Sequence, residues 1–266
     1  MLDGLAPARR RTVLLATTLA LLLLVVLAGL GIARALDDGP AVDPVAQDEP
    51  GPVLLVAGYG ASGAGLETLA DRLRAEGRTV EVVSGTDGGT GDLRDQAVAL
   101  GDAAETLAER TGSASVDVVG HSAGGVVARL WVAEQGGGSL ARRVVTLGSP
   151  HHGTEVADLG AELTPGSCPE ACRQLTTDSP LLAELNADDE TPPGPVWVSL
   201  WTEGDRVVVP ATSGRLEGAV AYAVQDVCPG RAVEHGDLPS DDAVVGMVLE
   251  ALGGAVPDAP PPRCPA

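Results

Sequence analysis

Residues 115–131, SVDVVGHSAGGVVARLW, join two apolar runs through a single serine that stands between glycines. The first run has the composition of a buried strand, and the second has the apolar character of a helix. Gly-x-Ser-x-Gly at such a junction is typical of a nucleophile elbow, a tight turn that presents a serine between a strand and a helix. The motif therefore makes Ser122 the candidate nucleophile. The alternative is an ordinary serine in a glycine-rich loop.

The rest of the chain alternates between predicted strands and predicted helices. Short apolar or alternating runs predict strands at residues 52–58, 79–83, 115–120, 142–148, 196–201 and 219–227. Helical spacing predicts helices at residues 66–75, 93–110, 123–134 and 240–252. Asp92 is a candidate cap for the second of these helices, and Asp241 or Ser240 for the last. This alternation predicts one α/β domain over residues 53–254, with a mainly parallel sheet and helices on both faces.

Two segments depart from the alternation. Residues 155–195 are rich in proline and too long for a plain connection, so we expect a lid-like insertion over one edge of the sheet. Residues 255–266 are expected to be a C-terminal tail that Cys264 could fasten to the domain.

The four cysteines lie at positions 168, 172, 228 and 264, and an even number outside the cytoplasm predicts two disulfides. Three pairings are possible, and proximity in the chain favours Cys168 with Cys172 and Cys228 with Cys264. Zinc is the rival interpretation, but no second close cysteine pair exists, and the adjacent His151 and His152 lack ligand spacing. We therefore predict no metal site.

The N-terminus predicts a membrane-spanning helix. Arginines at positions 9–11 precede an uncharged stretch, residues 12–33, whose helical length of about 33 Å would cross a hydrocarbon core of about 30 Å. Basic residues before this stretch and acidic residues after it place the bulk of the chain outside the cytoplasm. We therefore predict that residues 1–36 form a basic stub and a transmembrane anchor, followed by an exposed linker rich in proline and aspartate at 37–52.

Alternatives to an anchor are a buried core helix and a cleaved signal peptide. Ala33-Arg34-Ala35 fits a cleavage pattern, and cleavage after Ala35 would release a secreted protein. The apolar run is longer than the hydrophobic region of a signal peptide, which favours the anchor. The formal net charge of −20 argues against nucleic acid and anionic lipid surfaces as partners. We expect a monomer.

A serine hydroxyl needs a base to remove its proton, and the chain has four histidines. His121 lies inside the elbow motif, beside Ser122, and is not placed to be the base. His151 and His152 follow the strand predicted at residues 142–148. Hydrolases with an elbow run serine, then acid, then histidine along the chain, and His235 leaves the most room for an acid between. His235 is therefore the candidate base.

Asp205, in WTEGDRVVVP, follows a predicted strand and is the candidate acid, because ligands of parallel sheets gather at the carboxyl ends of the strands. Glu203 and Asp226 are its rivals. An elbow hydrolase also needs two backbone amides as an oxyanion hole. One belongs to the residue after the nucleophile, here Ala123, and the other to a loop after an early strand, where Tyr59 is the candidate.

Five segments, VLLVAGYG, VDVVGHSAGGVVARLW, VVTLGSPHHGT, WTEGDRVVVP and EHGDLP, occur in this order within residues 52–252. Together they resemble the secreted bacterial triacylglycerol lipases and esterases of the α/β-hydrolase superfamily, especially the short actinobacterial type. The resemblance implies an α/β-hydrolase fold and an acyl-enzyme mechanism on lipid or other acyl esters, without an organic cofactor. It assigns the roles of nucleophile, acid and base to Ser122, Asp205 and His235, and those of oxyanion amides to Tyr59 and Ala123. Many members carry His-Gly where this chain has Ala57-Gly58.

Other functions are also compatible with these residues. A thioesterase or acyltransferase would use the same three residues, and a catalytically inactive domain could serve as a surface binding module. Residues 58–63 also match Gly-x-Gly-x-x-Gly, the fingerprint of dinucleotide binding. That interpretation is opposed by the next strand, which ends at Val83-Ser84 without the acid expected to hold the ribose.

Overall fold

The computed structural model describes residues 18–19, 21–26, 29 and 42–265, and the chain divides into two units at Ala41–Val42. Residues 12–33, the predicted membrane span, lie in large part outside the described residues. No helix among the residues that are described is both long and apolar enough to cross a bilayer.

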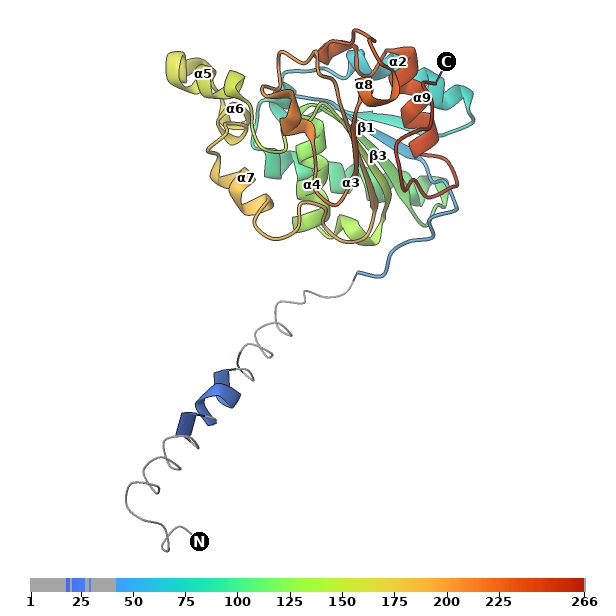
Figure 1. The fold of residues 1–266 in the computed structure, drawn as a ribbon. Helices are drawn as coiled ribbons and strands as arrows, with labels where there is room; N and C mark the ends of the chain where they lie inside the picture. The colour runs from blue at the N-terminus through green and yellow to red at the C-terminus, as the bar shows by residue number, and fades with distance from the viewer. Residues whose placement is uncertain (1–17, 20, 27–28, 30–41, 266) are drawn as a thin grey trace, which may run out of the picture. The chain divides into compact units, whose positions relative to one another are not determined.

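Within residues 42–265, six strands form one sheet in which every neighbouring pair is parallel, in the order β2-β1-β3-β4-β5-β6. Figure 1 labels β1 and β3 in this sheet. The strands are β1 (Val53–Val56), β2 (Val80–Val83), β3 (Val116–His121), β4 (Ala141–Leu147), β5 (Val196–Trp201) and β6 (Val220–Ala223). The predicted parallel α/β architecture is confirmed.

Alternation along β1 separates two cores. Leu54 and Val56 pack with buried residues of helices α3 and α4, whereas Val53 and Leu55 pack with those of α2 and α9. Helices therefore cover both faces of the sheet, as a parallel sheet requires. The helices are α2 (Glu67–Ala75), α3 (Leu93–Thr111), α4 (Ala123–Glu134), α5 (Glu155–Leu163), α6 (Glu170–Gln174), α7 (Pro180–Leu185), α8 (Val224–Val227) and α9 (Asp242–Ala251).

The helix caps predicted from the sequence are present in the structure, but one strand is shorter than predicted. The carboxylate of Asp92 accepts the N–H of Arg94 at the start of α3, and that of Asp241 caps α9. The strand predicted at residues 219–227 ends at Ala223 and turns into α8. The strand ends early because the Asp226 carboxylate accepts the Ala223 N–H at 2.8 Å and stabilises a helical turn there.

The inserted segment carries α5, α6 and α7, which are grouped on one side of the domain (Figure 1). It packs on helices α3 and α4, and its end contacts the residues that lead into the edge strand β6, where the Glu217 N–H donates to Glu190 at 2.7 Å. Leucines 181, 182 and 185 of α7 join the core of α4, and the Leu93 N–H at the start of α3 donates to Gln174 of α6 at 2.8 Å. The structure contains both predicted disulfides, Cys168–Cys172 in this segment and Cys228–Cys264 at the tail.

A buried charge cluster lies at the amino ends of the strands. Asp117 of β3 and Arg142 of β4 are fully buried and joined by two hydrogen bonds of 2.9 and 2.7 Å. Arg78 also donates to Asp117. Arg142 further donates to the carbonyl of Gln47 at 2.9 Å and to that of Leu252 at 2.7 Å. This cluster therefore ties part of the predicted linker, and the end of α9, to the sheet.

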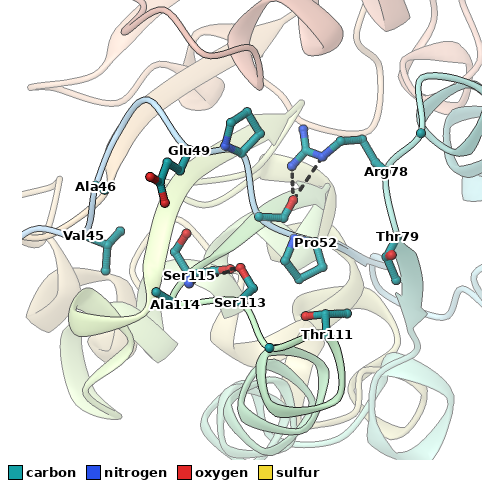
Figure 2. Close-up of a pocket in the computed structure, with 14 residues that line it drawn as sticks. Val45, Ala46, Glu49, Pro52, Arg78, Thr79, Thr111, Ser113, Ala114 and Ser115 are labelled. Carbon is teal, nitrogen blue, oxygen red and sulfur yellow. Dashed lines mark hydrogen bonds between the residues drawn. The ribbon is translucent and has the colours of Figure 1, made fainter.

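A groove of about 500 Å³ lies beside this cluster (Figure 2). It runs between residues 45–52 and the turns that precede β2 and β3, and Arg78 donates two hydrogen bonds to the Gly51 carbonyl at its edge. The groove lies at the amino ends of the strands, which is the opposite end of the sheet from Ser122.

We predict that Asp117→Asn lowers the free energy of unfolding by about 3–5 kcal/mol, because it leaves the buried Arg142 guanidinium without a countercharge. Denaturant-induced unfolding followed by circular dichroism measures this loss. Asp71→Asn is the matched control, since the Asp71 carboxylate pairs with Arg74 on the surface, and we expect it to cost less than about 1 kcal/mol. Equal losses in the two variants would contradict the prediction.

Candidate active site

The candidate residues gather at the carboxyl ends of the parallel strands. Ser122 follows β3, Tyr59 lies in the loop after β1, and Asp205 follows β5. His235 begins a short 3₁₀ turn, His235–Asp237, that lies beyond β6. Loops at this end of a parallel sheet are where side chains from distant segments meet.

Ser122 occupies a conformation that non-glycine residues seldom adopt, with φ +55° and ψ −128°. It is held there by its own N–H, which donates to the Leu147 carbonyl at 2.9 Å, and by α4, which begins at the next residue. The amino end of α4 carries partial positive charge, which favours a developing negative charge near Ser122.

Glycines on both sides make this turn possible. A Cβ atom at Gly120 would lie 2.5 Å from the Gly125 nitrogen, and one at Gly124 would lie 2.3 Å from the Val56 carbonyl oxygen. Backbone atoms occupy these positions and cannot move aside, so no side chain fits at either site. The elbow predicted from the motif is therefore present in its geometry.

Asp205 and His235 form a buried pair. The Nδ1 atom of His235 lies 2.7 Å from Oδ2 of Asp205, and the two side chains are 9% and 1% exposed. The other carboxylate oxygen of Asp205 accepts the N–H groups of Val207 and Val208, each at 2.8 Å. These bonds fix the carboxylate so that one oxygen faces the imidazole. A proton on Nδ1 then leaves Nε2 free to accept one.

The backbone at Leu147–Gly148 connects this pair to the serine. Leu147 accepts the Ser122 N–H, and a Cβ atom at Gly148 would lie 3.2 Å from Asp205 Oδ2 and 3.3 Å from His235 Nδ1. Within the described residues the Ser122 hydroxyl makes no hydrogen bond, so the serine and His235 are not bonded to each other in this state. Such bonds are often long in ligand-free sites and tighten when substrate binds.

The two candidate oxyanion amides flank the serine. Ala123 is the first residue of α4, and Gly58 brings the loop of Tyr59 against Ser122, because a Cβ atom at Gly58 would lie 2.8 Å from Ser122 Cβ. In the described part of the chain, the backbone N–H groups of Tyr59 and Ala123 donate no hydrogen bond. Both are therefore available to a ligand atom beside Ser122.

The rival acids and histidines are engaged elsewhere. Asp226 caps α8, and the exposed Glu203 makes no contact with a histidine among the hydrogen bonds of the described residues. His151 is fully buried, with Nε2 3.1 Å from the Thr146 hydroxyl, and burial lowers its pKa well below the usual value. His152 pairs with Glu190 at 2.8 Å. The structure thus brings Asp205, and neither rival, to His235.

His121 has a role that the sequence did not suggest. Its Nε2 lies 3.0 Å from the His235 carbonyl oxygen, and the two rings are 4.9 Å apart. Burial, and to a lesser extent positive charge on His235, lower the pKa of His121 to about 4. A neutral His121 that carries its proton on Nε2 can donate a hydrogen bond to that carbonyl and so hold the backbone of His235 in place. The motif alone gave no sign of this contact, which joins segments 114 residues apart.

A pocket of about 240 Å³ opens beside the serine and is mostly apolar. It is lined by Tyr59, Ser122, Pro150, Thr154, Val156, Ala157, Gly160, Ser167, Cys172, Leu175, Val207 and Val208. Half of these residues belong to the inserted segment. Among the described residues, no group of three or more His, Cys, Asp or Glu side chains gathers as a metal site would require.

Comparison with known proteins gives one family match and several structures of similar fold. Residues 79–161, which include the elbow, match the PGAP1-like alpha/beta domain family model. No curated protein sequence matches the chain.

Three solved structures are similar at low identity. The mature lipase BlEst2 of Bacillus licheniformis is 16% identical, with a TM-score of 0.64 over 81% of this chain and 96% of that one. Lipase B of Aspergillus fumigatus is 15% identical, with a TM-score of 0.65 over 80% of this chain and 55% of that one. An alpha/beta hydrolase, MGS-MChE2, from a lagoon-sediment metagenome of Mar Chica, Morocco, is 15% identical, with a TM-score of 0.50 over 76% of this chain and 91% of that one. These likenesses show that the chain has the α/β-hydrolase fold.

The burial of His121 predicts a pH-dependent stability. The folded-state pKa of about 4 lies below the unfolded value of about 6.5, so folding favours the neutral ring. The resulting stability is complete above about pH 6.5 and is lost as the pH falls toward 4, by an amount on the order of 3 kcal/mol. We expect His121→Gln to make the free energy of unfolding decline less steeply over this range. Parallel declines in wild type and variant, measured by denaturant titration, would contradict this assignment.

Proposed function

We propose that this chain is a serine hydrolase that cleaves carboxylic esters, with acyl esters of lipids as its substrate class, through an acyl-enzyme intermediate. The observation that carries the proposal is the buried Asp205–His235 pair, at 2.7 Å, beside a serine held at positive φ in an elbow. The α/β-hydrolase fold and the lipases that share it at low identity support the same reaction class.

In this mechanism Ser122 attacks the ester carbonyl while His235 removes the hydroxyl proton and then gives it to the leaving alkoxide. Asp205 fixes the imidazole tautomer and stabilises the imidazolium that forms. The amides of Tyr59 and Ala123 receive the oxyanion, and one such donor is typically worth about 2.7–4 kcal/mol. Water then attacks the acyl-enzyme with His235 as its base.

The pocket surface favours an apolar substrate. Three of its lining residues, Tyr59, Val156 and Val207, are large apolar side chains that are 41%, 44% and 45% exposed. Exposed apolar side chains that surround a concave site commonly contact a ligand. Leu159 and Leu163 extend this surface along α5, at 54% and 74% exposure.

Ser122→Ala and His235→Ala are each expected to lower kcat on p-nitrophenyl esters by several orders of magnitude, and the double variant to be little worse, because the residues act as a unit. Asp205→Asn is expected to cost about 10³–10⁴-fold. Steady-state kinetics and labelling by a fluorophosphonate measure these losses.

His152→Ala and Glu203→Gln are controls on exposed residues outside the Asp205–His235 pair and should keep activity within a few-fold of wild type. Activity that survives His235→Ala but not His151→Ala would refute the assignment of the base. No turnover of any ester and no labelling by the fluorophosphonate would show an inactive binding module instead.

We also infer that the globular part lies outside the cytoplasm, tethered by the predicted span at residues 12–33. Two disulfides in the described part of the chain support an oxidising compartment. The full chain should fractionate with membranes and resist extraction by high salt. A mature protein that begins at Leu36 would show a cleaved signal peptide instead.

A further inference from the structure

A helical glycine and a disulfide lie at one end of the active-site pocket, in the wall that the inserted segment contributes. Val156, Ala157 and Gly160 of α5 line the pocket, and Cys172 lies across from Gly160. A Cβ atom at Gly160 would have one neighbour within 4 Å outside the helix backbone, the Cys172 sulfur at 3.4 Å. This end of the pocket is thus bounded by the Cys168–Cys172 disulfide.

Neither backbone strain nor close packing explains a glycine at position 160. Its φ lies in the ordinary helical range, whereas Gly120, Gly124 and Gly58 would each place a Cβ atom within 2.8 Å of another atom. Inside a helix, glycine is less favourable than alanine. The space that Gly160 leaves open is space in the pocket, between α5 and the disulfide.

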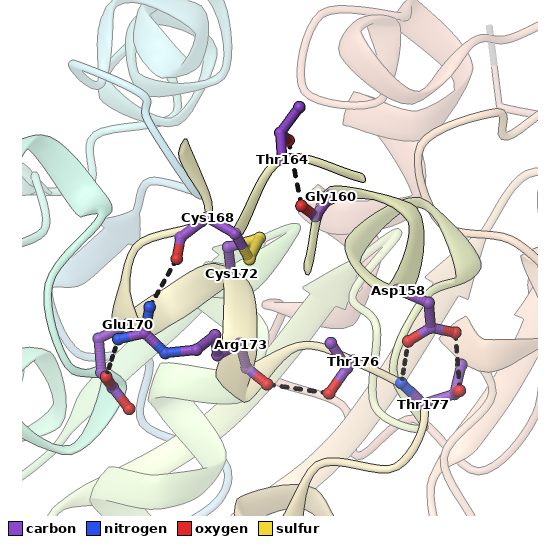
Figure 3. Close-up of a disulfide and its surroundings, with 9 residues drawn as sticks. All are labelled: Asp158, Gly160, Thr164, Cys168, Glu170, Cys172, Arg173, Thr176 and Thr177. Atoms are coloured by element: carbon purple, nitrogen blue, oxygen red, sulfur yellow. Dashed lines mark hydrogen bonds and ion pairs between the residues drawn. A yellow bond between two sulfur atoms is a disulfide. The ribbon is translucent and has the colours of Figure 1, made fainter. Parts of the chain in front are cut away.

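Hydrogen bonds join α5 to the segment that carries the disulfide (Figure 3). The Gly160 carbonyl accepts both the N–H and the hydroxyl of Thr164, each at 3.1 Å, which ends α5 just before the disulfide loop. Asp158 of α5 accepts the N–H and the hydroxyl of Thr177, each at 2.8 Å, on the far side of α6. Helix α5 is therefore bonded on both sides of the segment that contains Cys172.

We propose that Gly160 and the Cys168–Cys172 disulfide set the length of acyl chain that the enzyme accepts, and that its substrates are esters of short and medium acyl groups. This inference rests on the proposed esterase function. The pocket volume of about 240 Å³ is below the usual range for small-molecule sites, about 300–1,000 Å³.

The experiment compares kcat/KM of the full-length protein on p-nitrophenyl acetate, butyrate, octanoate, laurate and palmitate. Wild type is expected to prefer butyrate and octanoate and to lose activity on laurate and palmitate. Gly160→Ala should lower kcat/KM on octanoate by about fourfold, the value of one buried methylene (about 0.8 kcal/mol), with acetate unchanged. Gly160→Val adds three carbons and should lower kcat/KM on octanoate by about 50-fold, chiefly by raising KM.

Gly166→Ala is the matched control, because Gly166 is an exposed glycine of the same segment with nothing near its Cβ position and no place in the pocket wall. It should leave the chain-length profile unchanged. Loss of activity by the same factor on acetate and octanoate in Gly160→Val would overturn the proposal and indicate a structural role. Wild-type preference for laurate or palmitate would overturn it as well.

The disulfide is tested by the double variant Cys168→Ala/Cys172→Ala, which is expected to raise laurate activity relative to butyrate because the end wall loosens. Cys228→Ala/Cys264→Ala removes the other disulfide, which does not line the pocket, and should leave this ratio unchanged. Equal ratios in wild type and both double variants would overturn the role of the disulfide. Absence of activity on every ester in the wild type would refute the proposed function, a result distinguishable from these.

Discussion

The close approach of α4 to the middle of the sheet is the constraint on which the rest of the candidate site depends. No atom can be added at Gly120 or Gly124, because backbone atoms of α4 and β1 already lie within 2.3–2.5 Å of a Cβ position there. This contact compresses the turn and forces Ser122 to positive φ. Such strain costs on the order of 1–3 kcal/mol. Burial of apolar side chains on both faces of the sheet offsets this cost.

Placement of the base follows from several weak restraints that act together. Asp205 is fixed by the N–H groups of Val207 and Val208 and holds the imidazole of His235. His121 holds the same residue through its backbone carbonyl, while burial keeps the His121 ring neutral. The elbow thus contributes both the serine and a side chain that positions the histidine, because His121, the last residue of β3, and Ser122, which follows it, have different partners.

The two ends of the sheet have different roles. The amino ends bury the Asp117–Arg142 pair, which fastens residues near Gln47 and the end of α9 to the strands. The carboxyl ends carry the strained serine, the Asp205–His235 pair and an apolar pocket. Charge that stabilises the fold is therefore kept apart from groups that must change protonation. The inserted segment adds the pocket wall without altering the sheet.

The sequence alone determined the order of strands and helices, the elbow and its serine, because apolar periodicity and glycine spacing are local properties of the chain. It also led to Asp205, since a carboxylate just past a strand end must lie at the same edge of the sheet as Ser122. It was wrong about the end of β6, where a single carboxylate caps a helical turn. Only the tertiary structure decided which acid meets His235, that His121 contacts its carbonyl, and that Gly160 faces Cys172. Each of these depends on distances between segments far apart in the chain, and such distances are set by packing of the whole domain.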